Sequence, residues 1–272
     1  MKKYLKIELK RGFCNRMYVI SLLIGCTIAL LQIFLEVLPV SVYNYMETSM
    51  KNVRPHSVFQ KWMGSSYLML AFVFFTIFPL LAAIPFGGSL TSDRRTGYIK
   101  NIFTRINKKT YYTCKFITVF LTGATAAVLP LFLNLLLSMM ILPSLLPDIA
   151  SSTFPISATS AWAEIFYTHP FLYLFIYFCL IFIASGILTT LTCAFSFLVK
   201  YEYVVLLTPF LFYQGISFLS SFFVNESLDM QRWLVPWQPV KLDFAVIIIE
   251  LSAIIIFTLS VYVLKSKRSE GY

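Results

Sequence analysis

The sequence predicts an all-α, polytopic membrane protein with six transmembrane helices, and three observations lead to this prediction. First, 58% of the 272 residues are hydrophobic and only 12% are charged, whereas soluble domains carry about 25% charged residues. Second, six long apolar runs follow one another along the chain. Third, lysine and arginine gather in the short segments beside these runs. Lipid is therefore the expected solvent for much of the chain.

The six apolar runs lie at residues 18–40, 65–90, 115–142, 170–198, 203–224 and 244–264. An α-helix rises about 1.5 Å per residue, so each run is long enough to cross about 30 Å of hydrocarbon. Pro79, Pro85, Gly87 and Gly88 fall near the end of the second run and predict a bend or a loosened helix there. No internal repeat or soluble region separates the runs, so residues 1–272 are expected to form one membrane domain.

Successive segments between the apolar runs lie on alternate sides of the membrane, and lysine and arginine are unevenly divided between these two sides. Residues 1–17, residues 91–115, Lys200 and the residues after 264 carry 17 of the 22 positive charges. The segments at 41–64, 143–168 and 225–243 carry the other five. Because cytoplasmic segments of membrane proteins are enriched in these residues, the N- and C-termini are both expected in the cytoplasm.

The first 17 residues are predicted to form an N-terminal interfacial helix. Leu5, Leu9 and Phe13 recur every fourth residue, with four lysines beside them. Such a helix suits the anionic surface of the inner leaflet, so membrane lipid is an expected partner. A helix that only fixes topology explains the pattern equally well.

Several motifs that are typical of nucleotide-binding and catalytic sites are absent from the sequence. It contains no Gly-x-x-x-x-Gly-Lys-Ser/Thr phosphate loop, no His-Glu-x-x-His motif and no Gly-x-Ser-x-Gly elbow. Its five cysteines include no Cys-x-x-Cys pair, and its two histidines lie far apart, so neither a disulfide nor a metal site is expected. The chain is therefore not expected to be an enzyme or to bind nucleic acid, and no cofactor is expected within it.

The basic segment between the second and third runs is a candidate docking element. It reads Thr-Ser-Asp-Arg-Arg-Thr-Gly-Tyr-Ile-Lys from residue 91, followed by Asn-Ile-Phe-Thr-Arg-Ile-Asn-Lys-Lys. A short helix here would present Tyr98, Ile102 and Phe103 on one side, which suits a groove on a partner protein. A loop whose charges only fix topology is the alternative.

This segment resembles the loop after the second span of ABC-2 type transporter permeases. Members of that family show an acidic-basic-x-Thr/Ser-Gly-Thr/Tyr run, then an Arg-Pro-Ile-Ser-Arg-like element and a lysine that opens the third span. Here the run is Asp93 to Tyr98, the second element begins at Arg105, and the lysine is Lys115. The chain departs from the pattern because Ile106, not proline, follows Arg105. Six spans and a long segment before the sixth extend the resemblance over most of the chain.

The resemblance implies the membrane half of an ATP-binding-cassette transporter. A separate ATPase subunit would bind ATP and magnesium, and two permeases, as two copies or as homologues, would assemble with two ATPases. The positions that match the family's ATPase-coupling elements are Asp93, Arg94, Arg95, Thr96, Gly97, Tyr98, Ile102, Phe103, Arg105 and, in the N-terminal helix, Glu8.

Three residues near the outer side are candidates for a substrate pathway. Glu250 is the only acidic residue well inside a predicted span, and it lies in the sixth. A carboxylate at that depth is costly, so it is expected to face protein or water. It fits either a hydrogen bond to a neighbouring helix or a substrate or proton role. Trp233 and Trp237, which are flanked by prolines, fit either an aromatic anchor at the membrane interface or a gate.

The function expected from these features is that of a multi-pass permease subunit in the cell membrane of a bacterium. Apolar, aromatic-rich spans favour a hydrophobic or amphipathic substrate, such as an antimicrobial peptide, and small permeases of this type resemble bacteriocin export or immunity proteins. An ion-gradient-driven secondary transporter and a non-transporting assembly or sensor protein are the alternatives. A secondary transporter would be expected to carry several ionisable residues within its spans.

Overall fold

The computed structural model describes residues 1–47, 55–66, 68–147, 156, 162–222, 228–236 and 244–268. In this part of the chain all regular structure is helical. The helices are α1 (Lys2–Phe13), α2 (Arg16–Gln32), the π-helical turn η1 (Ile33–Val37), α3 (Leu38–Glu47), α4 (Val58–Lys61), α5 (Met69–Ala83), α6 (Ser89–Arg95), α7 (Tyr98–Phe103), α8 (Lys108–Ile141), α9 (Ala163–Thr168), α10 (Pro170–Phe195), α11 (Glu202–Ser220), α12 (Met230–Leu234) and α13 (Phe244–Arg268).

Five helical stretches of the described residues are long and apolar enough to cross a membrane. They are Arg16–Tyr43, Lys108–Ile141, Pro170–Phe195, Glu202–Ser220 and Ala245–Lys265. These stretches correspond to five of the six predicted spans. The chain is thus a helical bundle built for a lipid environment, as its composition predicts.

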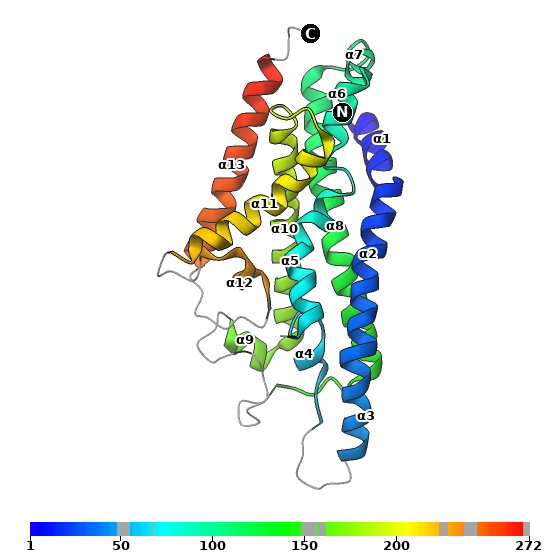
Figure 1. Cartoon of the computed structure of the whole chain (residues 1–272), viewed down its shortest axis with the longest axis vertical. Helices are drawn as coiled ribbons and strands as arrows, with labels where there is room; N and C mark the ends of the chain where they lie inside the picture. Colours follow the sequence, from blue (N-terminus) through cyan, green and yellow to red (C-terminus); the bar gives the residue numbers. More distant parts are fainter. Residues whose placement is uncertain are drawn as a thin grey trace.

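The second predicted span, 65–90, is shorter in the structure than the sequence indicates. Only α5, with 15 residues, is a continuous apolar helix in this region, and 15 residues rise about 22 Å, which is less than the hydrocarbon thickness. Turns occupy the residues around Pro85, Gly87 and Gly88, because these residues disfavour the helix. Figure 1 shows that α4, α5 and α6 together still follow the bundle from one end to the other.

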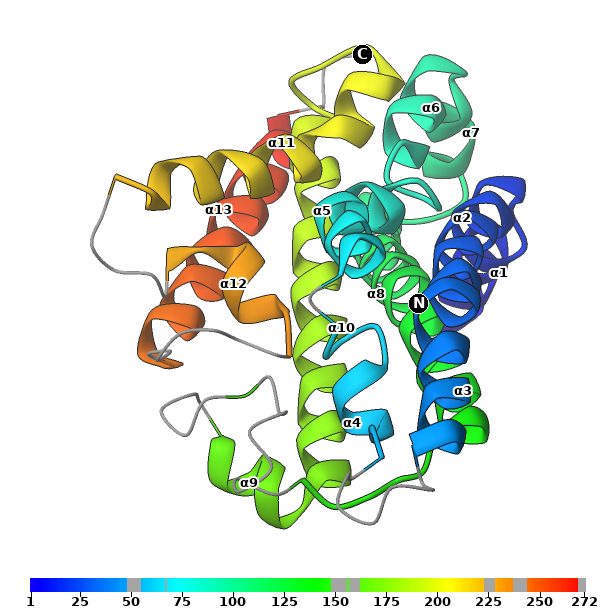
Figure 2. The ribbon, with the colours of Figure 1, turned by 60° about the horizontal axis from the view of Figure 1, so that its bottom comes forward.

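The long helices pack around α8 and α10. α8 packs against α1, α2, α5 and α10, while α10 also packs against α11 and α13. Figure 1 places α1, α6, α7, the start of α8 and the last turns of α13 at one end of the bundle, and Figure 2 shows α3, α4 and α9 at the opposite end. We call the first of these the basic end, because the basic residues of α1, α6, α7 and α8 gather there. Which side of the membrane it faces stays a prediction.

The N-terminal helix packs on the bundle through a stripe other than that of Leu5, Leu9 and Phe13. α1 runs beside the first turns of α8, with Tyr4 next to Tyr111 and Glu8 next to Lys115. Its buried residues are Tyr4, Glu8 and Gly12, spaced four apart, whereas Leu5, Leu9 and Phe13 are only half-buried. Close helix packing at Gly12 explains this arrangement. In the structure α1 therefore packs on the bundle through the stripe of Tyr4, Glu8 and Gly12, and its position at the membrane interface stays a prediction.

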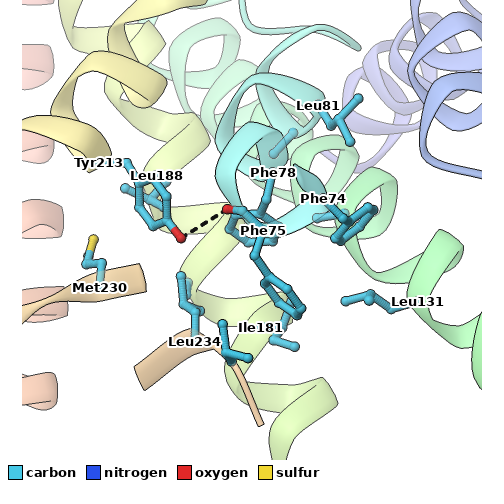
Figure 3. Close-up of a cluster of buried hydrophobic side chains, with 14 of the residues drawn as sticks. Phe74, Phe75, Phe78, Leu81, Leu131, Ile181, Leu188, Tyr213, Met230 and Leu234 are labelled. Atoms are coloured by element: carbon cyan, nitrogen blue, oxygen red, sulfur yellow. Dashed lines mark hydrogen bonds between the residues drawn. The ribbon is translucent and has the colours of Figure 1, made fainter. Parts of the chain in front are cut away.

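A core of apolar side chains fills the middle of the bundle. Figure 3 shows Phe75 and Phe78 of α5 facing Leu188 of α10 and Tyr213 of α11, whose hydroxyl donates a hydrogen bond to the Phe75 carbonyl at 3.1 Å. Met230 and Leu234 of α12 approach the same cluster and are fully buried. The short helix α12 is thus seated on the core rather than lying on the surface.

Candidate functional site

Six side chains form a buried ionic network at the basic end of the bundle. They are Tyr4, Glu8 and Arg11 of α1, Asp93 of α6, and Tyr111 and Lys115 of α8. Lys115 Nζ lies 2.6 Å from Asp93 Oδ2 and 3.5 Å from Glu8 Oε2. The Arg11 guanidinium lies 2.8 Å from Glu8 Oε1 and 2.8 Å from Asp93 Oδ1. Hydroxyl groups of Tyr4 and Tyr111 donate to Glu8 and Asp93, each at 2.7 Å.

The charges of this network are balanced, and three of the four charged side chains are almost fully removed from water, while that of Arg11 is 34% exposed. The side chains of Glu8 and Lys115 are 0% exposed, and that of Asp93 is 5% exposed. Burial by itself would raise the pKa of Asp93, but the charge of Lys115 and the hydrogen bonds from Arg11 and Lys115 hold this pKa below its ordinary value. Burial would likewise lower the pKa of Arg11, but its hydrogen bond to Asp93 raises it. Both groups are therefore ionised at neutral pH.

The predicted coupling residues of α6 face three long helices of the bundle. Asp93 bonds α8 through Lys115. Arg94 donates to the Ser196 carbonyl at the end of α10, at 2.6 Å, and its guanidinium lies over the Phe197 ring. Arg95 lies 3.9 Å from Glu202 in the first turn of α11. α6 is thus tied to the ends of α8, α10 and α11.

A left-handed glycine separates α6 from α7. Gly97 has φ +74°, a conformation that favours glycine, and it is the residue before α7. The side chains of Tyr98, Ile102 and Phe103 are half-buried and pack on an apolar cluster of this chain. Phe103, for example, contacts the Tyr111 ring edge-on, with the ring centroids 5.6 Å apart.

The other side of this helix pair is exposed and polar. The residues exposed there are Thr96, Lys100, Asn101, Thr104 and Arg105, while Arg94 and Arg95 are exposed beside their contacts with α10 and α11. We call Lys100, Asn101, Thr104 and Arg105 the α7 face. The apolar side chains singled out from the sequence hold α7 on the bundle.

Glu8 and Asp93 lie within this chain's own network. Glu8, which matches the family's ATPase-coupling elements, interacts in the structure with Tyr4, Arg11 and Lys115. Asp93 is likewise paired internally. The two carboxylates join α1, α6 and α8.

Two of the three predicted pathway residues are in direct contact. The indole Nε1 of Trp233 in α12 donates a hydrogen bond to Glu250 Oε2 in α13, at 3.1 Å. Trp233 is completely buried, and Glu250 Oε1 has no hydrogen-bond partner among the described residues. Trp237 lies outside the described residues.

The short helix α12 is held from two further sides. Asp229, which precedes α12 and caps its first turn, accepts a hydrogen bond from Ser217 of α11 at 2.8 Å. The Tyr173 hydroxyl of α10 donates to the Pro236 carbonyl. α12 and the residues beside it are therefore held by hydrogen bonds to α10, α11 and α13. They lie on the side of the core away from the basic end (Figure 1).

A second buried polar network was missed by sequence reasoning. Asn134 of α8 accepts a hydrogen bond from the Met63 amide at 2.8 Å and donates to the Gln32 side chain of α2, also at 2.8 Å. Gln32 in turn donates to the Lys61 carbonyl and to Glu36. These bonds satisfy the non-helical backbone before α5, which would otherwise be buried without partners. The available signal was a pair of amide residues inside predicted spans.

No group of three or more His, Cys, Asp or Glu side chains placed to hold a metal ion occurs in the described part of the chain. Comparison of the sequence and structure with protein-family models, curated proteins and solved structures finds no match for this chain.

Proposed function

We propose that this chain is the membrane permease subunit of an ATP-driven transporter, and that a separate ATPase docks on the α7 face. The observation that carries the proposal is the attachment of α6 to three long helices. Behind the exposed α7 face, Asp93, Arg94 and Arg95 contact α8, α10 and α11. A force applied by a partner to α7 therefore reaches the ends of three helices at once.

The same helices connect this surface with the opposite half of the bundle. α10 bonds α6 through Ser196 and α12 through Tyr173, while α11 bonds α6 through Glu202 and α12 through Ser217. A movement of α6 would tilt these helices and shift α12. In this proposal α12, with Trp233 and Glu250, lies on the outer part of the substrate pathway, where two discrete arrangements of packed helices would open and close it.

The apolar interior favours a hydrophobic or amphipathic substrate, such as an antimicrobial peptide. A complex of two permeases and two ATPases in a bacterial cell membrane follows from the resemblance to ABC-2 permeases. In this complex the permease has no catalysis of its own, and ATP and magnesium are bound by the ATPase.

Site-specific photo-crosslinking tests the proposed docking. A photoreactive amino acid is placed at Lys100 on the α7 face and, as a matched control, at the exposed Ser144 at the opposite end of the bundle. In cells of the native host, position 100 is expected to capture an ATP-binding-cassette ATPase and position 144 is not. Capture of no ATPase at position 100, in cells that produce normal amounts of the chain, would contradict the proposal and favour a secondary transporter or an assembly protein.

A further inference from the structure

The ionic network divides into two halves that are each neutral. Within α1, Glu8 and Arg11 pair at 2.8 Å and Tyr4 donates to Glu8. Across α6 and α8, Asp93 and Lys115 pair at 2.6 Å and Tyr111 donates to Asp93. Separating the halves breaks the contacts of Arg11 with Asp93 and of Lys115 with Glu8. It leaves every charge with an opposite charge beside it, so the large penalty of an unpaired buried charge is avoided.

The helix α1 also carries two different contact faces. One is the stripe of Tyr4, Glu8 and Gly12 that faces α8 in the structure. The other is the half-buried stripe of Leu5, Leu9 and Phe13, which is flanked by exposed lysines at positions 2, 3, 6 and 10. A helix with an apolar stripe and lysines beside it binds membranes that contain anionic lipid. α1 therefore has a second surface to bind when it leaves α8.

We propose that α1 is a detachable latch that exchanges between a docked position on α8 and an undocked position on the anionic lipid surface. In the docked position its half of the network is joined to Asp93 and Lys115. In the undocked position the lysines of α1 contact lipid phosphates, while α6 and α8 stay joined by their own ion pair. Any control of this exchange by ATP hydrolysis in a partner would rest on the proposed function, whereas the exchange itself does not depend on that function.

Gly12 provides a way to measure the docked position. A Cβ added at Gly12 would lie 2.7 Å from Thr118 Cγ2, so α1 lies directly on Thr118, which is 0% exposed. In a chain whose five native cysteines are replaced by alanine, Thr118→Cys serves as the reporter. Its reaction with N-ethylmaleimide requires α1 to move away. Ala127→Cys, buried in the same helix but packed in the central core, is the control that α1 does not cover.

Lipid composition and the network are then changed separately in vesicles that contain the full chain. Vesicles with roughly one third phosphatidylglycerol are expected to raise the labelling rate of Thr118→Cys at least about tenfold over pure phosphatidylcholine, because four lysines gain contact with anionic headgroups. Replacing these four lysines by glutamine is expected to abolish the lipid effect. In phosphatidylcholine, Glu8→Gln with Arg11→Gln is expected to raise the rate about tenfold or more, because the double variant removes charge-assisted hydrogen bonds that hold α1 in its docked position. The rate at Ala127→Cys should stay unchanged throughout.

Equal labelling of Thr118→Cys in both kinds of vesicle would overturn the proposal.

Hydrogen exchange of the wild-type chain is a second measurement, which does not depend on whether the double variant folds. Undocked α1 keeps its lipid contacts but loses its packing on α8, and a single helix of 12 residues opens more readily than the bundle, so its amide protection should fall below that of α8. In vesicles with phosphatidylglycerol, amides of α1 are expected to exchange hydrogen at least about tenfold faster than those of residues 112–118 in α8. Equal protection of the two segments would show one rigid unit and refute the latch. Neither measurement involves an ATPase, so a failure of the proposed function would be seen separately in the crosslinking experiment.

Discussion

At the scale of single residues, Asp93 is the point where the basic end of the bundle is held together. Its carboxylate accepts hydrogen bonds from Arg11 of α1 and from Tyr111 and Lys115 of α8. A buried ion pair adds little net stability by itself, because both ions lose their hydration. Removing one partner is far more damaging, since it leaves the other charge buried and uncompensated.

This asymmetry predicts the effect of Asp93→Asn. The variant is expected to lose about 3 kcal/mol of unfolding free energy, because Lys115 then has only Glu8, at 3.5 Å, as a counter-ion. Arg95→Gln is the control. The pair of Arg95 with Glu202 is long and its side chain is 66% exposed, so less than about 1 kcal/mol is expected. Thermal unfolding in detergent measures both, and equal stability of the two variants would contradict a supporting role for Asp93.

Glu250 and Trp233 give a second prediction at this scale. Glu250→Gln keeps an oxygen that accepts the Trp233 hydrogen bond, so a structural role predicts near-normal folding and less than about 1 kcal/mol of lost stability. Trp233→Phe removes the donor and leaves the carboxylate unsatisfied, which is expected to cost about 1–3 kcal/mol. A well-folded Glu250→Gln chain that no longer transports its substrate would instead assign Glu250 a direct part in the pathway.

At the scale of elements, α8 and α10 are tightly packed at Gly123. A Cβ at Gly123 would lie 2.2 Å from Thr189 Oγ1, whereas a Cβ at Gly215 in α11 would meet nothing within 4 Å. Gly123→Ala is therefore expected to cost about 1–3 kcal/mol through overpacking. Gly215→Ala is expected to leave stability unchanged or to raise it by up to about 1 kcal/mol through helix propensity. Similar unfolding temperatures for the two variants would mean that α8 and α10 are not packed as described.

The helices were predictable from the sequence to different degrees. Long apolar runs such as 115–142 and 170–198 became α8 and α10, because hydropathy identifies such helices, although α8 begins about two turns earlier, at the basic residue Lys108. The run at 65–90 is a continuous apolar helix only over α5, and the break that Pro85, Gly87 and Gly88 predict near its end is present in the structure. The contact face of α1 was missed because a stripe containing Tyr4, Glu8 and Gly12 does not look apolar, and its burial depends on the complementary charge of Lys115.

The candidate site was predictable as a segment but not in its detail. The basic segment from Asp93 to Arg105 forms a helix pair at one end of the bundle, and Trp233 and Glu250 meet. Which side of α7 is exposed depends on the cluster that receives Tyr98 and Phe103, and no local pattern reveals that cluster. For the same reason, the pairing of Glu8 with residues about 100 positions away could not be read from spacing alone.

At the scale of the whole molecule, the structure gathers the basic segments at one end of the bundle (Figure 1). The positive-inside rule then predicts that this end is cytoplasmic. In a chain without native cysteines, Ser144→Cys is expected to react with a membrane-impermeant maleimide in intact cells, and Thr104→Cys only after permeabilisation; both positions are exposed. The reverse pattern would invert the topology and remove the α7 face from any cytoplasmic ATPase.

The measurement that tests the central claim most directly is ATP hydrolysis by the partner ATPase in vesicles, with and without this chain. The account predicts that the wild-type chain changes the hydrolysis rate. Lys100→Glu with Arg105→Glu, which reverses two exposed charges of the α7 face without touching the ionic network, should reduce this effect at least about tenfold, while the chain stays folded and inserted. Ser144→Glu at the opposite end is the matched control and should retain the full effect. An unaltered ATPase response to the charge-reversed α7 face would contradict the claim that the ATPase acts on the bundle through α6 and α7.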